Sequence, residues 1–442
     1  MNSKVSLEFL QELMNEEDPD VTLETFQLAP GSGRGDNYTA MLYRIYIEGY
    51  KTETRTSLNV ENSDEIVSQD IREPWARSII YKCLPDSVAR REAYKSDALF
   101  CNEVAFYTKI IPALLTFQDQ HMENIAEPFG AIPLCYVARN DVLVLEDLRC
   151  RGFSMADRKL GLSTDQCRAV LIELARLHAL SLAMKQQQPE EFYELLNLQD
   201  GISEGLFDTE NEEWYRGYYR VAARNALAMV KEALPSDQDS SKYLKKFSEF
   251  VGDGTFFTKM VSLVSPQEPL AVFCHGDCWT NNILFKYSEE GDIIEVCLLD
   301  FQLVRYGSPA LDLANLIYCC TSRDQRTEHL VSLLSTYHET LYTRLVELTP
   351  EDHQITSLMD RDKLWEMINE EFHRCGKFGL GLALDMIPIS TCDSDQAPDL
   401  YQEKDTDTSS IAEENTPVWT SNKLCRQKMA DLVQELVDNG AL

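Results

Sequence analysis

Runs of alternating apolar and polar residues predict a strand-rich N-terminal third. Met41 to Ile47 alternates in this way, with β-branched and aromatic residues, and Ser78 to Lys82 is a second, shorter apolar run. Two more strands are expected at Ala131 to Val137 and at Val142 to Leu145, joined by a polar turn. Lys51 to Arg72 is polar and acidic, and we interpret it as an extended loop between strands. The pattern predicts a mostly antiparallel sheet.

Apolar residues at helical spacing predict one main helix in this third and a series of helices beyond residue 149. In Ser96 to Leu115 the apolar positions fall on one helix face, and Pro112 is expected to mark the end of the helix. Ser163 and Gln166 form a capping-box pattern before a helix that should end near Lys185. Other helices are expected at Leu7 to Met14, Glu212 to Ala233, Ser240 to Leu263, from Leu311 onward, and at Ser421 to Val437.

Two segments interrupt the helical pattern. Short strands are expected between Ala271 and Gln302, notably Ile283 to Tyr287 and Ile294 to Leu299, with a turn between them. Thr391 to Glu414 is rich in Asp, Ser and Thr, and we expect a mobile acidic loop there. The fold class is therefore α+β.

Composition and charge narrow the class of protein. The chain has 442 residues, of which 44% are hydrophobic and 26% charged, which is typical of a soluble globular protein large enough for two lobes. A formal net charge of −32 argues against binding to nucleic acid or to an anionic membrane surface. The acidic N-terminus does not have the pattern of a secretory signal, and the longest apolar stretch, Phe378 to Ile389, is short and carries Asp385. We expect a cytoplasmic protein.

The cysteines do not indicate a metal site. They number 13, an odd count, and are scattered without paired C-x-x-C spacing. Cys274 and Cys278 flank His275, but this spacing matches no standard zinc ligand set. Reduced thiols are the expected state.

The strongest chemical signal is an octet followed, after the predicted hairpin, by a tripeptide: His275-Gly276-Asp277-Cys278-Trp279-Thr280-Asn281-Asn282 and Asp300-Phe301-Gln302. Phosphoryl transfer needs the acceptor hydroxyl positioned, its proton accepted, and magnesium held across the phosphates. Asp277 is suited to accept that proton, Asn282 to serve as a neutral metal ligand, and Asp300 to supply the carboxylate oxygen that Mg²⁺ prefers. The pattern predicts phosphoryl transfer from ATP with Mg²⁺ as cofactor.

A lone Asp in a polar turn is most often a cap or turn residue. Here the spacing to Asn282 and the Asp beyond the hairpin favour the catalytic interpretation of Asp277. Against the protein-kinase signature H-R-D-x-x-x-x-N and D-F-G, Gly276 replaces the arginine and Gln302 the last glycine. The H-G-D form is similar to aminoglycoside and choline kinases, and His275 is assigned a supporting hydrogen bond.

Upstream residues supply a candidate phosphate site. Lys82 ends an apolar strand and Glu103 lies on the following helix, an arrangement that can hold the α- and β-phosphates of ATP, although either residue alone would be read as a surface charge. The turn Gly31 to Gly35 departs from G-x-G-x-x-G, and both a phosphate-covering turn and a simple flexible loop are open.

The run Val142 to Leu148 fits the strand and hinge that join the lobes of a kinase. Adenine would bind there through backbone groups, so Glu146 and Leu148 are candidate nucleotide-binding residues. Glu146 and Asp147 can equally be polar hinge residues. Asp312 is expected to anchor the catalytic loop from the start of a helix.

Together these residues resemble the ecdysteroid kinase-like family, a branch of the aminoglycoside/choline kinase superfamily. The matching segments are Tyr81 to Pro85, Phe100 to Tyr107, Val144 to Leu148, Leu174 to Ala179, His275 to Asn282 and Asp300 to Gln302. The resemblance implies a bilobal kinase fold, with residues 1–145 as the N-lobe and 146–442 as hinge and helical C-lobe. It also implies ATP, Mg²⁺ and phosphorylation of an ecdysteroid or another lipophilic alcohol. His178, in the helix match, is interpreted as a packing residue.

Three alternatives stay open. A kinase fold retained for nucleotide binding or scaffolding would not turn over, although the complete set of Lys82, Glu103, Asp277, Asn282 and Asp300 argues against it. Protein phosphorylation is disfavoured because the C-lobe has no A-P-E signature. A cationic acceptor such as choline or an aminoglycoside would suit the acidic surface.

The aromatic segments around Trp214 to Tyr219 and Phe378 to Ile389 could line a lipophilic pocket or form helix cores. The sequence does not determine the oligomeric state.

Overall fold

The computed structural model describes residues 5–31, 39–58, 66–235, 237–349, 358, 360–392 and 422–442. The strands are β1 Val21–Pro30, β2 Met41–Leu58, β3 Ile66–Cys83, β4 Cys135–Arg139, β5 Val142–Glu146, β6 Phe153–Met155, β7 Val272–Cys274, β8 Ile283–Tyr287, β9 Ile293–Leu298 and β10 Arg305–Gly307. The α-helices are α1 Leu7–Glu17, α2 Val88–Ala93, α3 Ser96–Ala105, α4 Ile111–Asp119, α5 Thr164–Gln187, α6 Pro189–Leu196, α7 Glu212–Ala233, α8 Gln238–Phe250, α9 Phe256–Val264, α10 Ala310–Cys320, α11 Arg323–Leu348, α12 Arg361–Thr391 and α13 Lys423–Asp438. Short 3₁₀ or π turns are η1 Phe106–Ile110, η2 Met122–Asn124, η3 Leu148–Arg151, η4 Thr209–Asn211, η5 Thr280–Asn282 and η6 Phe301–Leu303.

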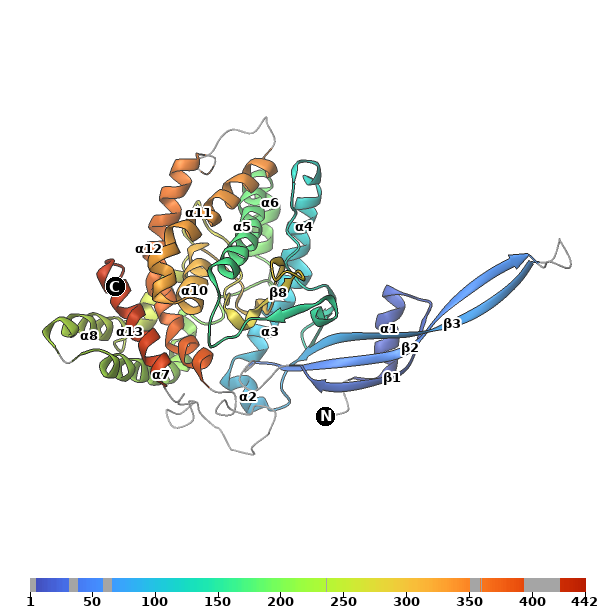
Figure 1. Ribbon diagram of the computed structural model, residues 1–442, viewed down its shortest axis with the longest axis horizontal. Helices are drawn as coiled ribbons and strands as arrows, with labels where there is room; N and C mark the ends of the chain where they lie inside the picture. Colours follow the sequence, from blue (N-terminus) through green and yellow to red (C-terminus); the bar gives the residue numbers. More distant parts are fainter. Residues whose placement is uncertain are drawn as a thin grey trace.

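The N-terminal sheet is antiparallel, with strand order β1-β2-β3-β5-β4, and a mainly helical body follows it (Figure 1). The α+β expectation is confirmed. Alternation along the strands gives the sheet two different faces. One face, with Ile45, Ile47 and Ile79, packs against Leu10 and Leu13 of α1. The opposite face carries Leu42, Ile80, Lys82 and Leu145 and forms one wall of a cavity.

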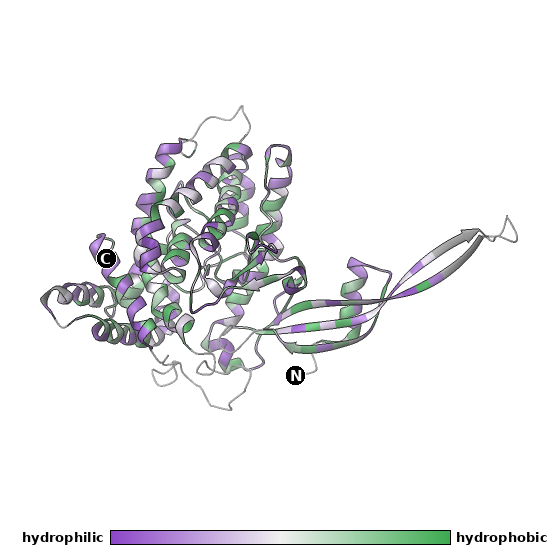
Figure 2. Cartoon of the chain, viewed as in Figure 1, coloured by the Kyte–Doolittle hydropathy of each residue, from purple (hydrophilic) through white to green (hydrophobic). Residues whose placement is uncertain are grey.

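The interpretation of Lys51 to Arg72 as a loop is wrong. Most of it forms the outer halves of β2 and β3, which stay paired out to Leu58 and Ile66 and project as a two-stranded ribbon beyond β1 (Figure 1). The composition was misleading because polar residues indicate exposure to water, and a solvent-exposed strand is as compatible with such residues as a loop is. Thr52, Thr54 and Ile71 are β-branched, as strands prefer. Figure 2 shows the mixed hydropathy along this ribbon.

Pro112 does not end its helix. The chain passes from α3 through the π turn η1 into α4, and the amide of Ile111 donates to the carbonyl of Phe106. The π turn restarts the hydrogen-bond ladder just before Pro112, which therefore lies in the first turn of α4, where its missing N–H costs nothing. The helix expected at Ser240 to Leu263 is two helices, α8 and α9.

The capping box at Ser163 is confirmed, because both of its hydrogen bonds are present at the start of α5. The expected helices at Leu7, Glu212, Leu311 and Ser421 appear as α1, α7, α10 and α13. The turn within Gly31 to Gly35 and the loop predicted for Thr391 to Glu414 lie almost entirely outside the described residues.

One stretch of the described chain, Ser96–Asp119, is long and apolar enough to cross a membrane by length and composition. Of its apolar window, 61% is buried inside the protein, as in the core helix of a soluble protein. Phe100, Phe106 and Leu114 pack in the main hydrophobic core.

Helix α10 carries Asp312 and packs closely against α12 at Gly379. A Cβ on Gly379 would lie 2.7 Å from the carbonyl oxygen of Ala314. We therefore expect Gly379→Ala to lower the free energy of unfolding by about 1–3 kcal/mol through overpacking. Helix propensity alone would raise it by about 1 kcal/mol. Urea unfolding measures the difference, and Gly130→Ala, where a Cβ meets nothing within 4 Å, is the control. A stabilised Gly379→Ala protein would contradict this account of the helix contact.

Candidate active site

The octet His275 to Asn282 connects β7 to β8, and a buried carboxylate at the start of α10 holds its first turn. Asp312 accepts hydrogen bonds from the backbone N–H groups of His275 at 2.6 Å and Gly276 at 2.8 Å. His178 of α5 lies 3.1 Å from the same carboxylate through Nε2. These contacts agree with the expected anchoring role of Asp312. They indicate that His178 orients Asp312 and does not itself take part in the chemistry.

Gly276 adopts φ +85°, and a Cβ there would lie 1.8 Å from the carbonyl oxygen of Leu303. Arg305 donates to the Gly276 carbonyl at 3.4 Å and forms an ion pair of 2.7 Å with Glu204. The catalytic loop therefore lies directly on the backbone that follows the Asp300 tripeptide. This close approach explains why the position holds glycine instead of the arginine of protein kinases.

Asp277 and Asn282 are hydrogen-bonded to each other. Asn282 Nδ2 donates to the Asp277 carboxylate at 2.9 Å and to the Asp277 backbone carbonyl at 3.0 Å. Burial and the nearby Asp300 carboxylate raise the pKa of Asp277 to about 7, despite the Asn282 hydrogen bond. A carboxylate with this pKa is matched to taking up a proton near neutral pH.

His275 supports Asp277 without facing it as a base. Its Nδ1 accepts the Asp277 backbone N–H at 3.2 Å, so its Nε2 carries the proton and donates to the Leu299 carbonyl at 3.0 Å. Burial lowers the pKa of His275, which keeps this neutral tautomer. The assignment of a supporting hydrogen bond to His275 agrees with this geometry.

Lys82 joins the sheet, helix α3 and the Asp300 tripeptide through two ion pairs. Its Nζ lies 2.5 Å from Glu103 and 2.8 Å from Asp300, and the Lys82 and Glu103 side chains are 4% and 1% exposed. Burial disfavours the ammonium, but the two carboxylates outweigh it and raise the pKa of Lys82. Burial raises the pKa of Glu103, which Lys82 opposes. The predicted lysine–glutamate pair is therefore present, with Asp300 as a third member.

Asp300 has a backbone conformation that non-glycine residues rarely adopt, with φ +64°. The next residue holds it there, because the Phe301 ring stacks on Phe106 at a centroid distance of 3.8 Å and contacts His275 at 4.5 Å. Gln302 accepts a hydrogen bond from Thr39 at 2.5 Å. The tripeptide thus connects helix, catalytic loop and sheet.

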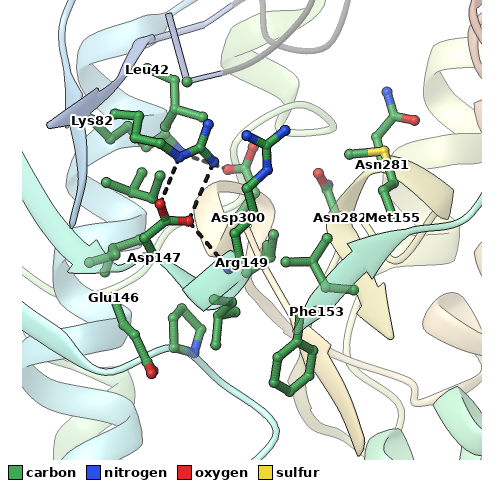
Figure 3. Close-up of a pocket in the computed structure, with 18 of the residues that line it drawn as sticks. Leu42, Lys82, Glu146, Asp147, Arg149, Phe153, Met155, Asn281, Asn282 and Asp300 are labelled. Atoms are coloured by element: carbon green, nitrogen blue, oxygen red, sulfur yellow. Dashed lines mark hydrogen bonds and ion pairs between the residues drawn. The ribbon is translucent and has the colours of Figure 1, made fainter. Parts of the chain in front are cut away.

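A cavity of about 350 Å³ lies between the N-terminal sheet and a wall formed by β6, the end of the octet, β8 and the turn at Asp300 (Figure 3). Its volume is within the range of ligand sites. Lys82, Glu103, Asn282 and Asp300 line one part of it; Leu145, Glu146, Leu148 and Phe153 line another. Six of the seven candidate residues named from the sequence therefore line one cavity. Asp277 is not in its lining and contacts it through Asn282.

The hinge region differs in one respect from the expected picture. Glu146 forms an ion pair with Arg151 at 3.3 Å, whereas the side chain of Asp147 is buried and bonded to Arg44. Glu146 and Leu148 stay predictions as nucleotide-binding residues. Arg44, Glu204 and Arg305 were missed, because a single charged residue in a strand or loop has no local signal of its partner.

The residues present fit a magnesium ion. The side-chain N–H groups of Asn282 donate to Asp277, and no described residue donates to the side-chain oxygen of Asn282, Oδ1. Lys82 contacts one carboxylate oxygen of Asp300, Oδ1, and leaves the other for a ligand. An amide oxygen and a carboxylate oxygen on the same cavity are the hard ligands that Mg²⁺ prefers. The cluster His178, Cys274 and Asp312 is less suited to a metal, because Asp312 already accepts three hydrogen bonds.

Comparison with known families identifies the chain. A model of the ecdysteroid kinase-like family matches residues 34–349. The chain belongs to the ecdysteroid kinase-like family. None of the curated proteins matches it.

Three solved structures with low similarity to this family member are named as kinases or phosphotransferases. A Plasmodium vivax ethanolamine kinase has 11% identity and a TM-score of 0.36, covering 99% of this chain and 88% of its own. A microcompartment-associated aminopropanol kinase has 10% identity and a TM-score of 0.36, with coverages of 98% and 95%. An aminoglycoside 2'-phosphotransferase IIIa mutant in complex with GDP has 12% identity and a TM-score of 0.32, with coverages of 85% and 100%.

The close contact at Gly276 in this ecdysteroid kinase-like protein predicts a large effect of a single methyl group. Gly276→Ala adds a clash with Leu303 to the strain of positive φ, whereas Gly152→Ala adds only the strain, since φ there is +86° with nothing within 4 Å. We expect Gly152→Ala to cost about 1–2 kcal/mol of unfolding free energy and Gly276→Ala a further ~1–3 kcal/mol or more. Urea titrations of both proteins measure this difference. Equal losses would show that the loop does not depend on the contact with Leu303.

Proposed function

We propose that this protein is an ATP- and Mg²⁺-dependent kinase that phosphorylates a hydroxyl group of a small molecule, an ecdysteroid or another lipophilic alcohol, in the cytoplasm. The observation that carries the proposal is the presence of two functional groups in the wall of one cavity and of a third that is hydrogen-bonded to that wall through Asn282. These are a cation held by two carboxylates, a pair of oxygen ligands, and a carboxylate with a pKa near neutrality. Phosphoryl transfer needs these groups and little covalent help.

Each residue has a separate task in this proposal. Lys82, oriented by Glu103, binds phosphate oxygens. Asn282 and Asp300 would hold Mg²⁺, which when bound supplies positive charge across the phosphates. Asp277 accepts the proton of the acceptor hydroxyl, and Asn282 fixes its carboxylate in place. The loop contacts to Asp312 keep Asp277 from turning away.

The nature of the acceptor rests on the family and on the chemistry of the chain. Tyr215 and Tyr219 are buried against Phe257, so they belong to the helix core, as the simpler interpretation had it. Burial and the nearby carboxylate of Asp385 in α12 raise the pKa of Tyr218. A single carboxylate among aromatic rings suits either a hydroxyl donor or a cation, so a kinase acting on an amino alcohol is the second candidate.

Removal of the proposed base provides the first test. We expect Asp277→Asn to lower kcat/KM by about 10²- to 10⁴-fold, because the acceptor proton loses its receiving group. In the wild-type protein kcat/KM should also fall as the pH drops through about 7, where the buried carboxylate takes up a proton. Steady-state assays across pH measure both effects. Asp141→Asn, on a side chain that is 70% exposed, is the matched control. A folded Asp277→Asn protein with the wild-type rate would exclude Asp277 as the base.

The acceptor is tested by offering the protein ATP, Mg²⁺ and three parallel sets of compounds: steroid alcohols, aminoglycosides, and choline with related amino alcohols. We expect a mass increase of one phosphate in the steroid set, because membership of the ecdysteroid kinase-like family favours an apolar alcohol. If product forms only in the cationic sets, the acceptor is a cationic alcohol and not a steroid, and the assignment as a kinase stands. Magnesium-dependent ATP binding without product in any set would favour the nucleotide-binding alternative.

A further inference from the structure

A buried charged pair lies in the sheet-side wall of the cavity, which also presents the apolar side chains of Ile80 and Leu145. Arg44 of β2 and Asp147, just after β5, are ion-paired at 2.7 Å, with side chains 10% and 4% exposed. Both line the cavity that holds Lys82 and Asp300. Burying a charge pair is costly, so its position calls for a physical reason.

The register of the sheet places Arg44 away from the phosphate end of the cavity. Leu42 pairs with Lys82, and Arg44 pairs with Ile80, two residues later in β2 and two residues earlier in the antiparallel β3. Two residues of a strand span about 7 Å. Arg44 therefore lies about one base width from the level of Lys82, beside the apolar residues Ile80 and Leu145.

Asp147 fixes the guanidinium and has no capacity left for a ligand. Its carboxylate accepts hydrogen bonds from Arg44 Nε at 2.7 Å and Nη2 at 3.4 Å, from Ser78 Oγ at 2.5 Å and from the Arg149 backbone N–H at 3.3 Å, which occupy its roughly four acceptor positions. Burial opposes ionisation, but the hydrogen bonds from Arg44 and Ser78 lower the pKa of Asp147, so the pair is charged. Among the described residues, Asp147 is the hydrogen-bonding partner of Arg44, and Nη1 has none. Arg44 itself lines the cavity.

We propose that Arg44, oriented by Asp147, contacts the nucleobase, so that base binding in this protein depends on a guanidinium. A guanidinium is planar and weakly hydrated, and it stacks on aromatic rings and donates to their acceptor atoms. The apolar residues Leu284 and Leu299 line the same cavity and supply its other surfaces. The inference rests on the proposed nucleotide-dependent function and adds a residue that determines how the base binds.

The experiment separates the base from the phosphates. Binding of adenosine and of Mg²⁺–tripolyphosphate is measured by calorimetry for the wild-type protein, Arg44→Met and Arg44→Lys. We expect Arg44→Met to weaken adenosine binding about tenfold and to change tripolyphosphate binding less than about twofold. Arg44→Lys should resemble Arg44→Met, since it keeps the charge and loses the plane. Lys82→Met is the matched control and should show the reverse pattern.

The double variant Arg44→Met/Asp147→Asn removes both charges and avoids leaving a buried carboxylate unpaired, should Arg44→Met fail to fold. Adenosine binding at wild-type strength in any folded Arg44 variant would overturn the inference. Loss of tripolyphosphate binding instead of adenosine binding would also overturn it, in favour of a phosphate contact. If the wild-type protein binds neither probe nor ATP, the proposed function itself fails, and the inference fails with it.

Discussion

The carboxylate of Asp312 is the constraint on which the candidate site depends. It is fully buried in the helical part of the protein and accepts hydrogen bonds from His178 and from the backbone amides of His275 and Gly276. Burial opposes its ionisation, but the hydrogen bonds from His178 and Gly276 lower its pKa. A buried charge with these donors is stable in one geometry only, because each lost donor leaves it unpaired. The loop is therefore fixed to α5 and α10 before any ligand arrives, and Asp277 follows as the next residue after the two that donate.

A second set of buried charges connects this rigid part to the sheet. Lys82, Glu103 and Asp300 come from a strand, a helix and the turn after β9, so their contact requires all three elements to be in place. The ring of Phe301, the residue after Asp300, packs between Phe106 and His275. The ion pair of Asp300 with Lys82 and the apolar packing of Phe301 therefore depend on each other. Movement of α3 would disturb the cation and the Asp300 backbone together, so order in the site is cooperative.

Most of this site was predictable because its residues occur at fixed separations along the chain. The octet, the Asp300 tripeptide and the Lys82–Glu103 pair identified four candidate residues that line one cavity, and the hinge run Val142 to Leu148 identified two more. Arg44, Asp147 and Ser78 meet from three strands or their ends, and such non-local pairs leave no spacing in a single sequence. The outer parts of β2 and β3 were missed for a different reason. The polarity of a segment predicts whether its side chains are buried, whereas strand pairing is made by hydrogen bonds of the backbone.

The charge of the cavity bears on how a nucleotide would enter. Its lining includes three cationic residues, Arg44, Lys82 and Arg149, and four anionic ones, Glu103, Glu146, Asp147 and Asp300. Arg44 and Lys82 are already paired with carboxylates, and the chain as a whole carries −32. A bare polyphosphate would meet a site that does not neutralise it, so the proposed donor has to bring its own cation. In the proposed function Asn282 and Asp300 would receive that cation, so the acidic character of the site would favour metal-bound nucleotide over free phosphate.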